Sequence, residues 1–505
     1  MLQTYPRKHT TRAPRALPGP SARVSGTRSP PTRCRIRNTL RHGRKGPYDA
    51  AHSVCTSADC SRPRPTWRKN WMQKLLRWSA LLAVLLLVLA ACTSQGASPS
   101  QSAAASSAPP DAAAICAADA FHCVEVAPGD PIRIASALAI TGDVAFLGND
   151  SNFGIDVAIA DRGQLLGHDV EIVHEDAGCG DAASGQTAAQ AIVADTTIVG
   201  VIGTTCSRTA VPAMPVLAAA GLVMISPSNT APSLTNPDKD DFGGPFYFRT
   251  AYNDNVQGAA VAKYACEELK VTTAATVHDG SPYAEQLQQV FADKFKELCN
   301  GTVSHQEAVN VGDTDFHPVL TTIAADKPQL LFYPIFSPEG PLLTKQTADV
   351  AGLENTILFG ADGLKDGAFI AAAGQFAADK GMYFSGPDLN FGDKYTNDFL
   401  PKYYALSGTT TPLAPYHAHA YDAANILMDA IAAVAVTDAD GNLQIPRDAI
   451  REYVHNLKDY PGLTGTLTCN ENGDCGSSEV SIAQLKPDST GALVYTEVWT
   501  TRSAS

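Results

Sequence analysis

The sequence predicts an α/β protein of two similar lobes, each built around a parallel central sheet. From Asp130 onward, short β-rich runs alternate with helical stretches, which is the pattern of parallel strands connected by helices. The alternation occurs in two series of similar size. About 395 residues follow the N-terminal segments, and this is enough chain for two domains.

The first series begins with a strand at residues 131–139. Its other elements are strands at 169–174, 198–202 and 223–226 and helices at 152–162, 184–194 and 211–220. This order of strands and helices implies a parallel sheet with helices on both faces.

The second series begins after residue 250. Its elements are helices at 255–269, 283–298, 315–324 and 339–350 and strands at 274–278, 302–308, 329–333 and 356–359. In sheets of this kind ligands bind at the carboxyl ends of the strands, so functional residues are expected there.

The first 71 residues differ in composition from the rest. They hold 16 Lys or Arg against 2 Asp or Glu, a net +14 in a chain of −13, so residues 72–505 carry about −27. A basic, Arg- and Pro-rich segment cannot bury a core, and we expect it to be disordered. It could be a nucleic-acid tail or a transit peptide. We favour a translation start at Met72, because a complete signal sequence begins there.

Residues 72–91 form that signal sequence. Lys74 and Arg77 supply a positive region, and the 13 small or apolar residues at 79–91 are too few for a spanning helix. Leu-Ala-Ala before Cys92 resembles the bacterial lipobox, in which cleavage precedes an acylated cysteine. We therefore expect an exported protein, anchored through Cys92 on the extracytoplasmic face of a bacterial membrane, with residues 92–129 as a flexible stalk. An ordinary signal peptide with an incidental cysteine is the alternative.

Cysteine usage agrees with export, because eight of the 12 cysteines follow Cys92 and an even number in an exported chain indicates disulfides. Eight cysteines allow 105 pairings. The economical one joins near neighbours, Cys116 with Cys123, Cys179 with Cys206, Cys266 with Cys299 and Cys469 with Cys475.

Several classes of function are not expected. The acidic chain after residue 71 argues against nucleic acid. There is no P-loop, G-x-S-x-G or H-E-x-x-H motif, so neither an enzyme nor a cofactor is predicted. The stretch 178–183 matches a dinucleotide fingerprint only superficially, since it does not directly follow its strand. No metal site is expected, because His417 and His419 would point apart on a helix and 438–442 lacks the later glutamate of a calcium loop.

Polar residues follow three predicted strands. Ser207 and Thr209 come after the strand at 198–202 and a glycine turn, where free N–H groups at a helix start favour an anion such as a carboxylate. Residues 226–230 form a second polar strand end, and Asp362 follows the strand at 356–359. An anion site in one lobe and an acid in the other would suit a zwitterion between them. Helix capping and turn formation would explain the same residues without a ligand.

Taken in order, these segments resemble the type I periplasmic binding proteins of branched-chain amino-acid ABC importers, the leucine/isoleucine/valine-binding family. The resemblance covers about residues 130–499. It is carried by Ile140-Thr141-Gly142-Asp143 with Gly148, by 175–179, by Ile202-Gly203 with Cys206-Ser207, by Ile225-Ser226-Pro227 with Thr230, by 336–340, by 359–363, and by Tyr421-Asp422-Ala423.

The resemblance implies two Rossmann-like lobes that close on a ligand by hinge motion. It places three hinge crossovers near 248–252, 384–389 and 440–446. Lobe 1 would comprise 130–250 and 385–443, and lobe 2 would comprise 251–384 and 444–505. The resemblance also supports a Cys179–Cys206 disulfide.

The resemblance further implies roles for site residues. Ser207 and Thr230 would bind the ligand α-carboxylate, while the Ser228 carbonyl and Asp362 would bind the α-ammonium. The ligand side chain would contact Tyr283, Phe336 and Leu147.

Four residues depart from the family pattern. Asp362 stands where a longer Glu is common, Phe336 where Tyr is common, and Leu147 where an aromatic is common. Arg208, beside the carboxylate position, is unusual and could pair either with an acidic ligand side chain or with carboxylates on the solvent side.

The expected function is therefore capture of a branched-chain or other apolar amino acid by a monomeric binding protein. The partners would be the ABC permease and ATPase subunits, with the membrane reached only through the lipid anchor. Two alternatives stay open on the same fold, a binding protein for amides, urea or aromatic acids and a ligand-sensing receptor domain. Residues 301–505 contain neither the second spanning segment nor the output domain expected of a sensor.

Overall fold

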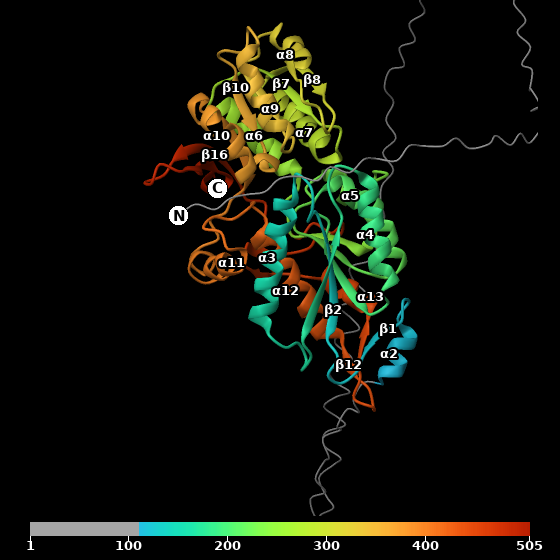
Figure 1. Ribbon diagram of the computed structural model, residues 1–505. Coiled ribbons are helices and arrows are strands. Elements are labelled where there is room, and N and C mark those ends of the chain that lie inside the picture. The colour runs from blue at the N-terminus through green and yellow to red at the C-terminus, as the bar shows by residue number, and fades with distance from the viewer. Residues whose placement is uncertain (1–110, 505) are drawn as a thin grey trace, which may run out of the picture. The chain divides into compact units, whose positions relative to one another are not determined.

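The computed structural model describes residues 111–504, and Figure 1 shows two central sheets with helices on both of their faces. The basic extension, the signal sequence and Cys92 lie outside the described residues. Within the described part, no helix combines the length and the apolar character needed to cross a membrane. The predicted α/β fold with two sheets is confirmed.

The first sheet is entirely parallel. Its order is β3 (Val170–Asp176), β2 (Ile132–Leu138), β4 (Ile198–Gly203), β5 (Met224–Ser226) and β6 (Tyr247–Arg249). Every residue of β4 is buried, because helices cover both faces of the sheet. One face packs against α3 (Ala145–Arg162) and α12 (His417–Val434), and the other against α4 (Ala182–Ala194) and α5 (Ser207–Ala219).

The second sheet is mixed. Its parallel part is β11 (Tyr383–Pro387), β10 (Ile357–Gly360), β9 (Leu330–Tyr333), β7 (Thr273–His278) and β8 (Thr302–Ala308). An antiparallel hairpin, β16 (Val480–Pro487) and β17 (Leu493–Thr500), extends it beside β11. The sequence predicted only the parallel strands up to β10.

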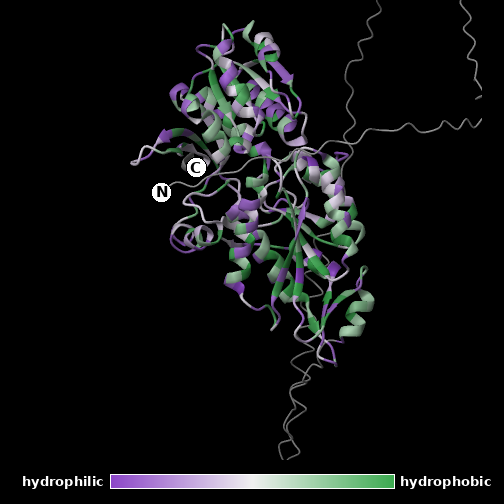
Figure 2. Ribbon diagram, viewed as in Figure 1, coloured by the Kyte–Doolittle hydropathy of each residue, from purple (hydrophilic) through white to green (hydrophobic). Residues whose placement is uncertain are grey.

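Helices cover both faces of this second sheet as well. On one face lie α6 (Asp254–Glu267) and α7 (Pro282–Cys299), and on the other α8 (His317–Ala324), α9 (Glu339–Gln346) and α10 (Gly367–Lys380). The ends of α7 show how the sequence sets a helix. The Ser281 hydroxyl accepts from the Ala284 amide at 3.2 Å, and Asn300 ends the helix in the left-handed conformation. In Figure 2 the apolar residues gather in the strands and on the helix faces turned to them.

The remaining elements are short. They are α2 (Ala112–Ala118), β1 (Cys123–Val126), α11 (Leu400–Ser407), β12 (Val436–Thr437), β13 (Leu443–Pro446), α13 (Arg447–His455), β14 (Tyr460–Gly462) and β15 (Gly465–Leu467). Two predicted helices begin earlier than expected, α3 at 145 rather than 152 and α5 at 207 rather than 211. Neither has a side-chain hydrogen bond at its N-cap, so the usual sequence sign of a helix start is missing.

Lobe boundaries differ from the expected ones at two places. The third crossover lies between Cys475 and β16, not near 440–446. Residues 443–475 stay with the first lobe, because Ile450 and Val454 of α13 are buried in its core. The chain before residue 130 is also not all stalk, because β1 pairs antiparallel with β13 and α2 precedes it.

All four near-neighbour disulfides are present, which confirms the economical pairing. They join Cys116 to Cys123, Cys179 to Cys206, Cys266 to Cys299 and Cys469 to Cys475. The last of these is buried in the core of lobe 1, just before the chain crosses to lobe 2.

Candidate ligand-binding site

A small cavity lies where the strand ends of the two lobes face each other. Its volume is about 20 Å³, close to the space that one water molecule needs. We call it the inner cavity. The residues that line it are Leu147, Thr205, Cys206, Ser207, Ser228, Tyr283, Phe336, Asp362, Gly363 and Tyr416. Six of the seven residues predicted for the ligand are therefore brought together. The seventh, Thr230, is buried and does not line this cavity.

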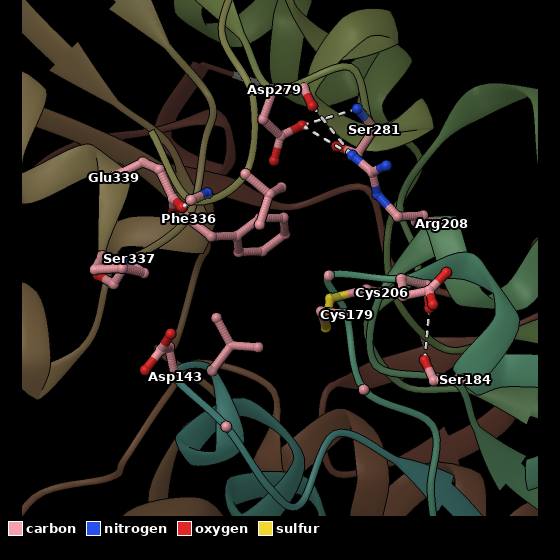
Figure 3. Close-up of a pocket in the computed structure, with 18 of the residues that line it drawn as sticks. Asp143, Cys179, Ser184, Cys206, Arg208, Asp279, Ser281, Phe336, Ser337 and Glu339 are labelled. Atoms are coloured by element: carbon pink, nitrogen blue, oxygen red, sulfur yellow. Dashed lines mark hydrogen bonds and ion pairs between the residues drawn. A yellow bond between two sulfur atoms is a disulfide. The ribbon is translucent and has the colours of Figure 1, made fainter. Parts of the chain in front are cut away.

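A wider cleft of about 430 Å³ opens beside the inner cavity. The two share the lining residues Cys206, Ser207, Tyr283 and Phe336. Figure 3 shows this outer cleft, with Arg208 on one wall and Glu339 on another. These four shared residues lie between the inner cavity and the outer cleft, so the two hollows adjoin.

Asp362 is the chemical centre of the inner cavity. Its carboxylate accepts hydrogen bonds from Gln257 Nε2 and the Tyr283 hydroxyl, both at 2.8 Å, and from the Tyr416 hydroxyl at 2.9 Å. Burial raises the pKa of Asp362, while these three donors oppose that rise. Tyr283 and Gln257 come from lobe 2 and Tyr416 from lobe 1, so the carboxylate joins the lobes.

A second buried acid, Asp254, lies at the start of α6. It is fully buried, and burial, followed by the nearby charge of Asp362, raises its pKa well above the ordinary value. An additional positive group in this region would therefore be favourable to both acids.

The opposite wall is the start of α5. Ser207 is its first residue and no side chain caps it, so the first backbone N–H groups are free of a capping partner. The Ser207 hydroxyl accepts from the Ala231 amide at 3.3 Å, and the Ser228 hydroxyl donates to the Thr205 carbonyl at 2.8 Å. An anionic group is stabilised at such a helix start.

The turn that precedes α5 requires glycine at Gly203. Its φ of +149° is one that side chains rarely adopt, and a Cβ there would lie 2.4 Å from the Ala137 carbonyl oxygen. The Cys179–Cys206 disulfide ties this turn to the loop after β3. The start of α5 is thus fixed by close backbone contact and by a covalent link.

Three contacts join the lobes around the site. Arg208 Nη2 donates to the Asp279 carbonyl at 3.1 Å and lies 3.9 Å from the Asp279 carboxylate. The Gln286 side chain exchanges two hydrogen bonds with Ser233, at 2.9 and 2.7 Å. Together with the Tyr416–Asp362 bond, they hold the lobes in contact. Of the two roles open for Arg208, pairing with a protein acid is the one seen.

The aromatic part of the cavity comes from both lobes. The Tyr283 and Phe336 rings lie 5.1 Å apart, and the Tyr416 hydroxyl also bonds to the Tyr252 hydroxyl at 3.0 Å. Leu147 of α3 closes the apolar side. Sequence reasoning missed Gln257, Thr205 and Tyr416, because only their distance to Asp362 or the cavity in space distinguishes them from ordinary helix and loop residues.

The two histidines considered as metal ligands, His417 and His419, both lie on α12 and are buried. His417 is fully buried between Tyr395, whose hydroxyl lies 2.7 Å from Nε2, and Asp150, 3.1 Å from Nδ1. Among residues 111–504 no group of three or more His, Cys, Asp or Glu is placed to hold a metal ion.

The fold and the site define a class of protein. Two α/β lobes, linked by crossovers, enclose a small polar cavity at the carboxyl ends of their strands, which is how a binding protein surrounds a small molecule. The chain belongs to the periplasmic binding protein family, whose model matches residues 131–492. This is a family of extracytoplasmic solute-binding proteins and not an enzyme family.

Known relatives carry names for amino-acid ligands. The Leu/Ile/Val-binding protein BraC3 of Rhizobium johnstonii is 30% identical over 358 residues, which are 70% of this chain and 90% of that protein. The leucine-, isoleucine-, valine-, threonine- and alanine-binding protein of Pseudomonas aeruginosa is 28% identical, over 72% of this chain and 91% of its own.

Solved structures share the fold. A leucine-binding protein from Thermotoga maritima has a TM-score of 0.63 at 24% identity, covering 72% of this chain and 97% of its own. A solute-binding protein of an ABC transporter from Rhodopseudomonas palustris, solved with p-hydroxybenzoic acid, has a TM-score of 0.64 at 18% identity and covers 74% and 97%.

Proposed function

We propose that this protein is the substrate-binding component of an ABC importer, and that it captures a branched-chain or other apolar amino acid between its lobes. The observation that carries the proposal is the pairing of opposite chemistries in one cavity. The buried Asp362 carboxylate lies on one side and the start of α5, with Ser207, lies on the other. A zwitterion satisfies both walls at once, because a buried charge left without a partner would be costly.

In this proposal the ligand carboxylate binds Ser207 and the first N–H groups of α5, and the ammonium binds Asp362 and the Ser228 carbonyl. The family resemblance assigns Thr230 to the carboxylate as well, although it lies outside the cavity lining, with its side chain beside Asp254. Tyr283, Phe336 and Leu147 surround the ligand side chain. Pocket shape then selects among side chains, with one methylene worth about 1–3 kcal/mol.

The names of the relatives support this ligand class, since they are those of binding proteins for leucine, isoleucine and valine. A second candidate, an aromatic acid, is favoured by one feature. The two oxygens of Asp362 already accept three hydrogen bonds from protein groups. The carboxylate therefore does not need a ligand ammonium as a hydrogen-bond donor. A fold neighbour solved with p-hydroxybenzoic acid is in keeping with this candidate.

Delivery completes the proposed function. The monomeric protein closes on its ligand and docks on a permease that is driven by ATPase subunits. The lipid at Cys92 holds it near that permease, on the outer side of the membrane. Digestion and mass spectrometry of the membrane-associated protein test the anchor: a diacylated N-terminal Cys92 is expected, and an unmodified Cys92 would contradict it.

An Asp362→Asn variant separates the two ligand classes. It keeps the size of the side chain but removes the negative charge. Calorimetric titration should show about tenfold or greater loss of affinity for leucine, isoleucine or valine, because a hydrogen bond to a charged group contributes about 1.5–3 kcal/mol. The matched control is Asp315→Asn on the surface, which should bind as the unmodified protein does. If the two variants bind every amino acid with equal affinity, and both still bind hydroxybenzoate, the result would favour the aromatic acid.

A further inference from the structure

A second cavity lies on the other side of the Asp362 wall. Its volume is about 420 Å³, and we call it the rear cavity. The walls come from α10, the hairpin β16–β17, the crossover after β11, and the loop of lobe 1 before α12. Its apolar surface includes Ile370, Leu389, Leu493, Pro412 and Pro415.

The rear cavity is separate from the ligand site but adjacent to it. The two share no lining residue. Two short segments reach both cavities. Tyr416 lines the inner cavity and the preceding residue, Pro415, lines the rear cavity. In the same way, Asp362 lines the inner cavity and Lys365, three residues later, lines the rear cavity. A Cβ added to Gly386 would lie 3.2 Å from Lys365 Nζ and 3.3 Å from Asp362 Cβ, so both side chains lie over this glycine of β11.

Lys365 is the chemical feature of the rear cavity. Its side chain is 8% exposed, and within residues 111–504 its ammonium has neither a hydrogen bond nor an ion pair. Three acids lie near it, Asp362, Glu497 and Asp388, but none is within ion-pair distance. Because the residue is little exposed, its ammonium is only partly hydrated and has no protein partner, so a ligand anion that paired with it would offset that cost.

Two acids, Asp366 and Glu497, also line the rear cavity, and neither forms an ion pair with Lys365. The Asp366 carboxylate accepts from the Phe369 amide at 2.6 Å and lies 3.2 Å from the Ser337 hydroxyl. Glu497 is exposed at the mouth of the cavity. These two negative charges disfavour an occupant with more than one negative charge.

We propose that the rear cavity is a second ligand-binding site, which takes a small monocarboxylate with an apolar body. The carboxylate pairs with the Lys365 ammonium, and the body lies against Ile370, Leu389 and Leu493. A phosphate or a dicarboxylate fits less well, since the walls are apolar and acids stand at the mouth. Because residues 411–415 come from lobe 1 and the other walls from lobe 2 and the crossovers, the occupant contacts both lobes and its binding is linked to their relative position.

Burial lowers the pKa of Lys365 to about 8, against the opposing effect of the three acids. The ammonium is therefore present at pH 7 and is lost as the pH rises through 8. Binding of the carboxylate should weaken over the same pH range. The ligand carboxylate stays ionised throughout that range, so the change comes from Lys365.

Calorimetric titration of the purified protein with hexanoate tests the proposal, with hexanamide as the uncharged match. Hexanoate should bind at pH 7 and hexanamide should bind about tenfold or more weakly, because the charge-assisted contact is lost. Lys365→Met should reduce hexanoate affinity by the same factor, whereas Lys345→Met, on the exposed face of α9, should not change it.

Two more variants distinguish the rear cavity from the ligand site and from misfolding. Leu493→Trp fills the rear cavity with Lys365 intact and should abolish hexanoate binding, while Ser207→Ala in the ligand site should leave it unchanged. Absence of hexanoate binding to the unmodified protein would overturn the proposal. So would equal binding of hexanamide, unchanged binding in both Lys365→Met and Leu493→Trp, or loss of hexanoate binding in Ser207→Ala.

Discussion

At the scale of single residues, the site is governed by buried charge. Asp362 lines the inner cavity, Asp254 is buried near enough to feel its charge, and Lys365 lines the rear cavity with Asp362 among its neighbouring acids. Each of these groups would be costly alone, and the attraction between the lysine and the acids offsets part of that cost. The stability of the protein should therefore depend on pH through them.

Lys365 gives the clearest dependence of stability on pH. Its pKa falls from 10.5 to about 8 on folding, so the folded protein binds fewer protons than the unfolded chain between pH 8 and 10.5. The contribution of Lys365 to the free energy of unfolding is thus lowest below pH 8, and it rises with pH up to about pH 10.5. Urea unfolding should show that rise in the unmodified protein and not in Lys365→Met, which should be more stable at pH 7 by about 3 kcal/mol at most. Parallel pH curves for the two proteins would contradict the buried, unpaired ammonium.

Arg208 acts on the equilibrium between open and closed lobes. Its contact with Asp279 exists only when the lobes meet, so it stabilises the closed form alone. Arg208→Met should weaken ligand binding by about twofold to tenfold, chiefly through faster dissociation in stopped-flow measurements. The control is Arg451→Met, whose ion-pair partners lie on its own helix and whose other contact, the Phe246 ring, is in the same lobe. Equal dissociation rates in the two variants would show that Arg208 is not a latch.

At the scale of elements, the sequence predicted the two βα series well. Most strands and helices from β2 to β10 fall close to their expected positions, because alternating apolar runs and turns mark them directly; β6 was not predicted, and α3 begins seven residues early. The chain after β10 was much less predictable. The hairpin β16–β17 and the return of α13 to lobe 1 depend on contacts with residues far away in the sequence.

The site residues were predictable to the same extent, where a local sequence pattern marks them. Ser207 and Asp362 were predictable because they follow strands and resemble a family motif. Tyr416 and Gln257, which bond to Asp362, come from a loop and a helix interior whose local patterns are those of ordinary structure. Only packing of distant elements brings them to the carboxylate.

The Cys179–Cys206 disulfide supports one such element, the start of α5. Its sequence separation of 27 implies about 3.5 kcal/mol of stabilisation by loop closure, against about 2 kcal/mol for the separation of 6 between Cys469 and Cys475. Replacing both cysteines by serine in each pair, and measuring the urea midpoint, should therefore give the larger loss for the first pair. That variant should also bind ligand more weakly, since the anion wall loses its covalent support. A larger loss for the second pair would contradict this account.

At the scale of the whole molecule, two lobes with their own central sheets meet around one small cavity. The inner cavity is bounded by both lobes, and the bonds of Arg208, Gln286 and Tyr416 cross between them. In the proposed function, ligand binding and lobe closure are therefore parts of one equilibrium. The rear cavity, bounded by the same two lobes, is placed to influence that equilibrium.

The central claim is that the inner cavity binds an amino-acid zwitterion. The most direct test is thermal unfolding of the purified protein against a panel of L-amino acids, small amides and hydroxybenzoates. A ligand at about 100 times its dissociation constant stabilises the folded protein by about 2.7 kcal/mol. We predict a clear rise in the unfolding temperature with leucine, isoleucine or valine, and a much smaller rise in Asp362→Asn. No rise with any L-amino acid, in a protein that unfolds cooperatively, would contradict the assignment.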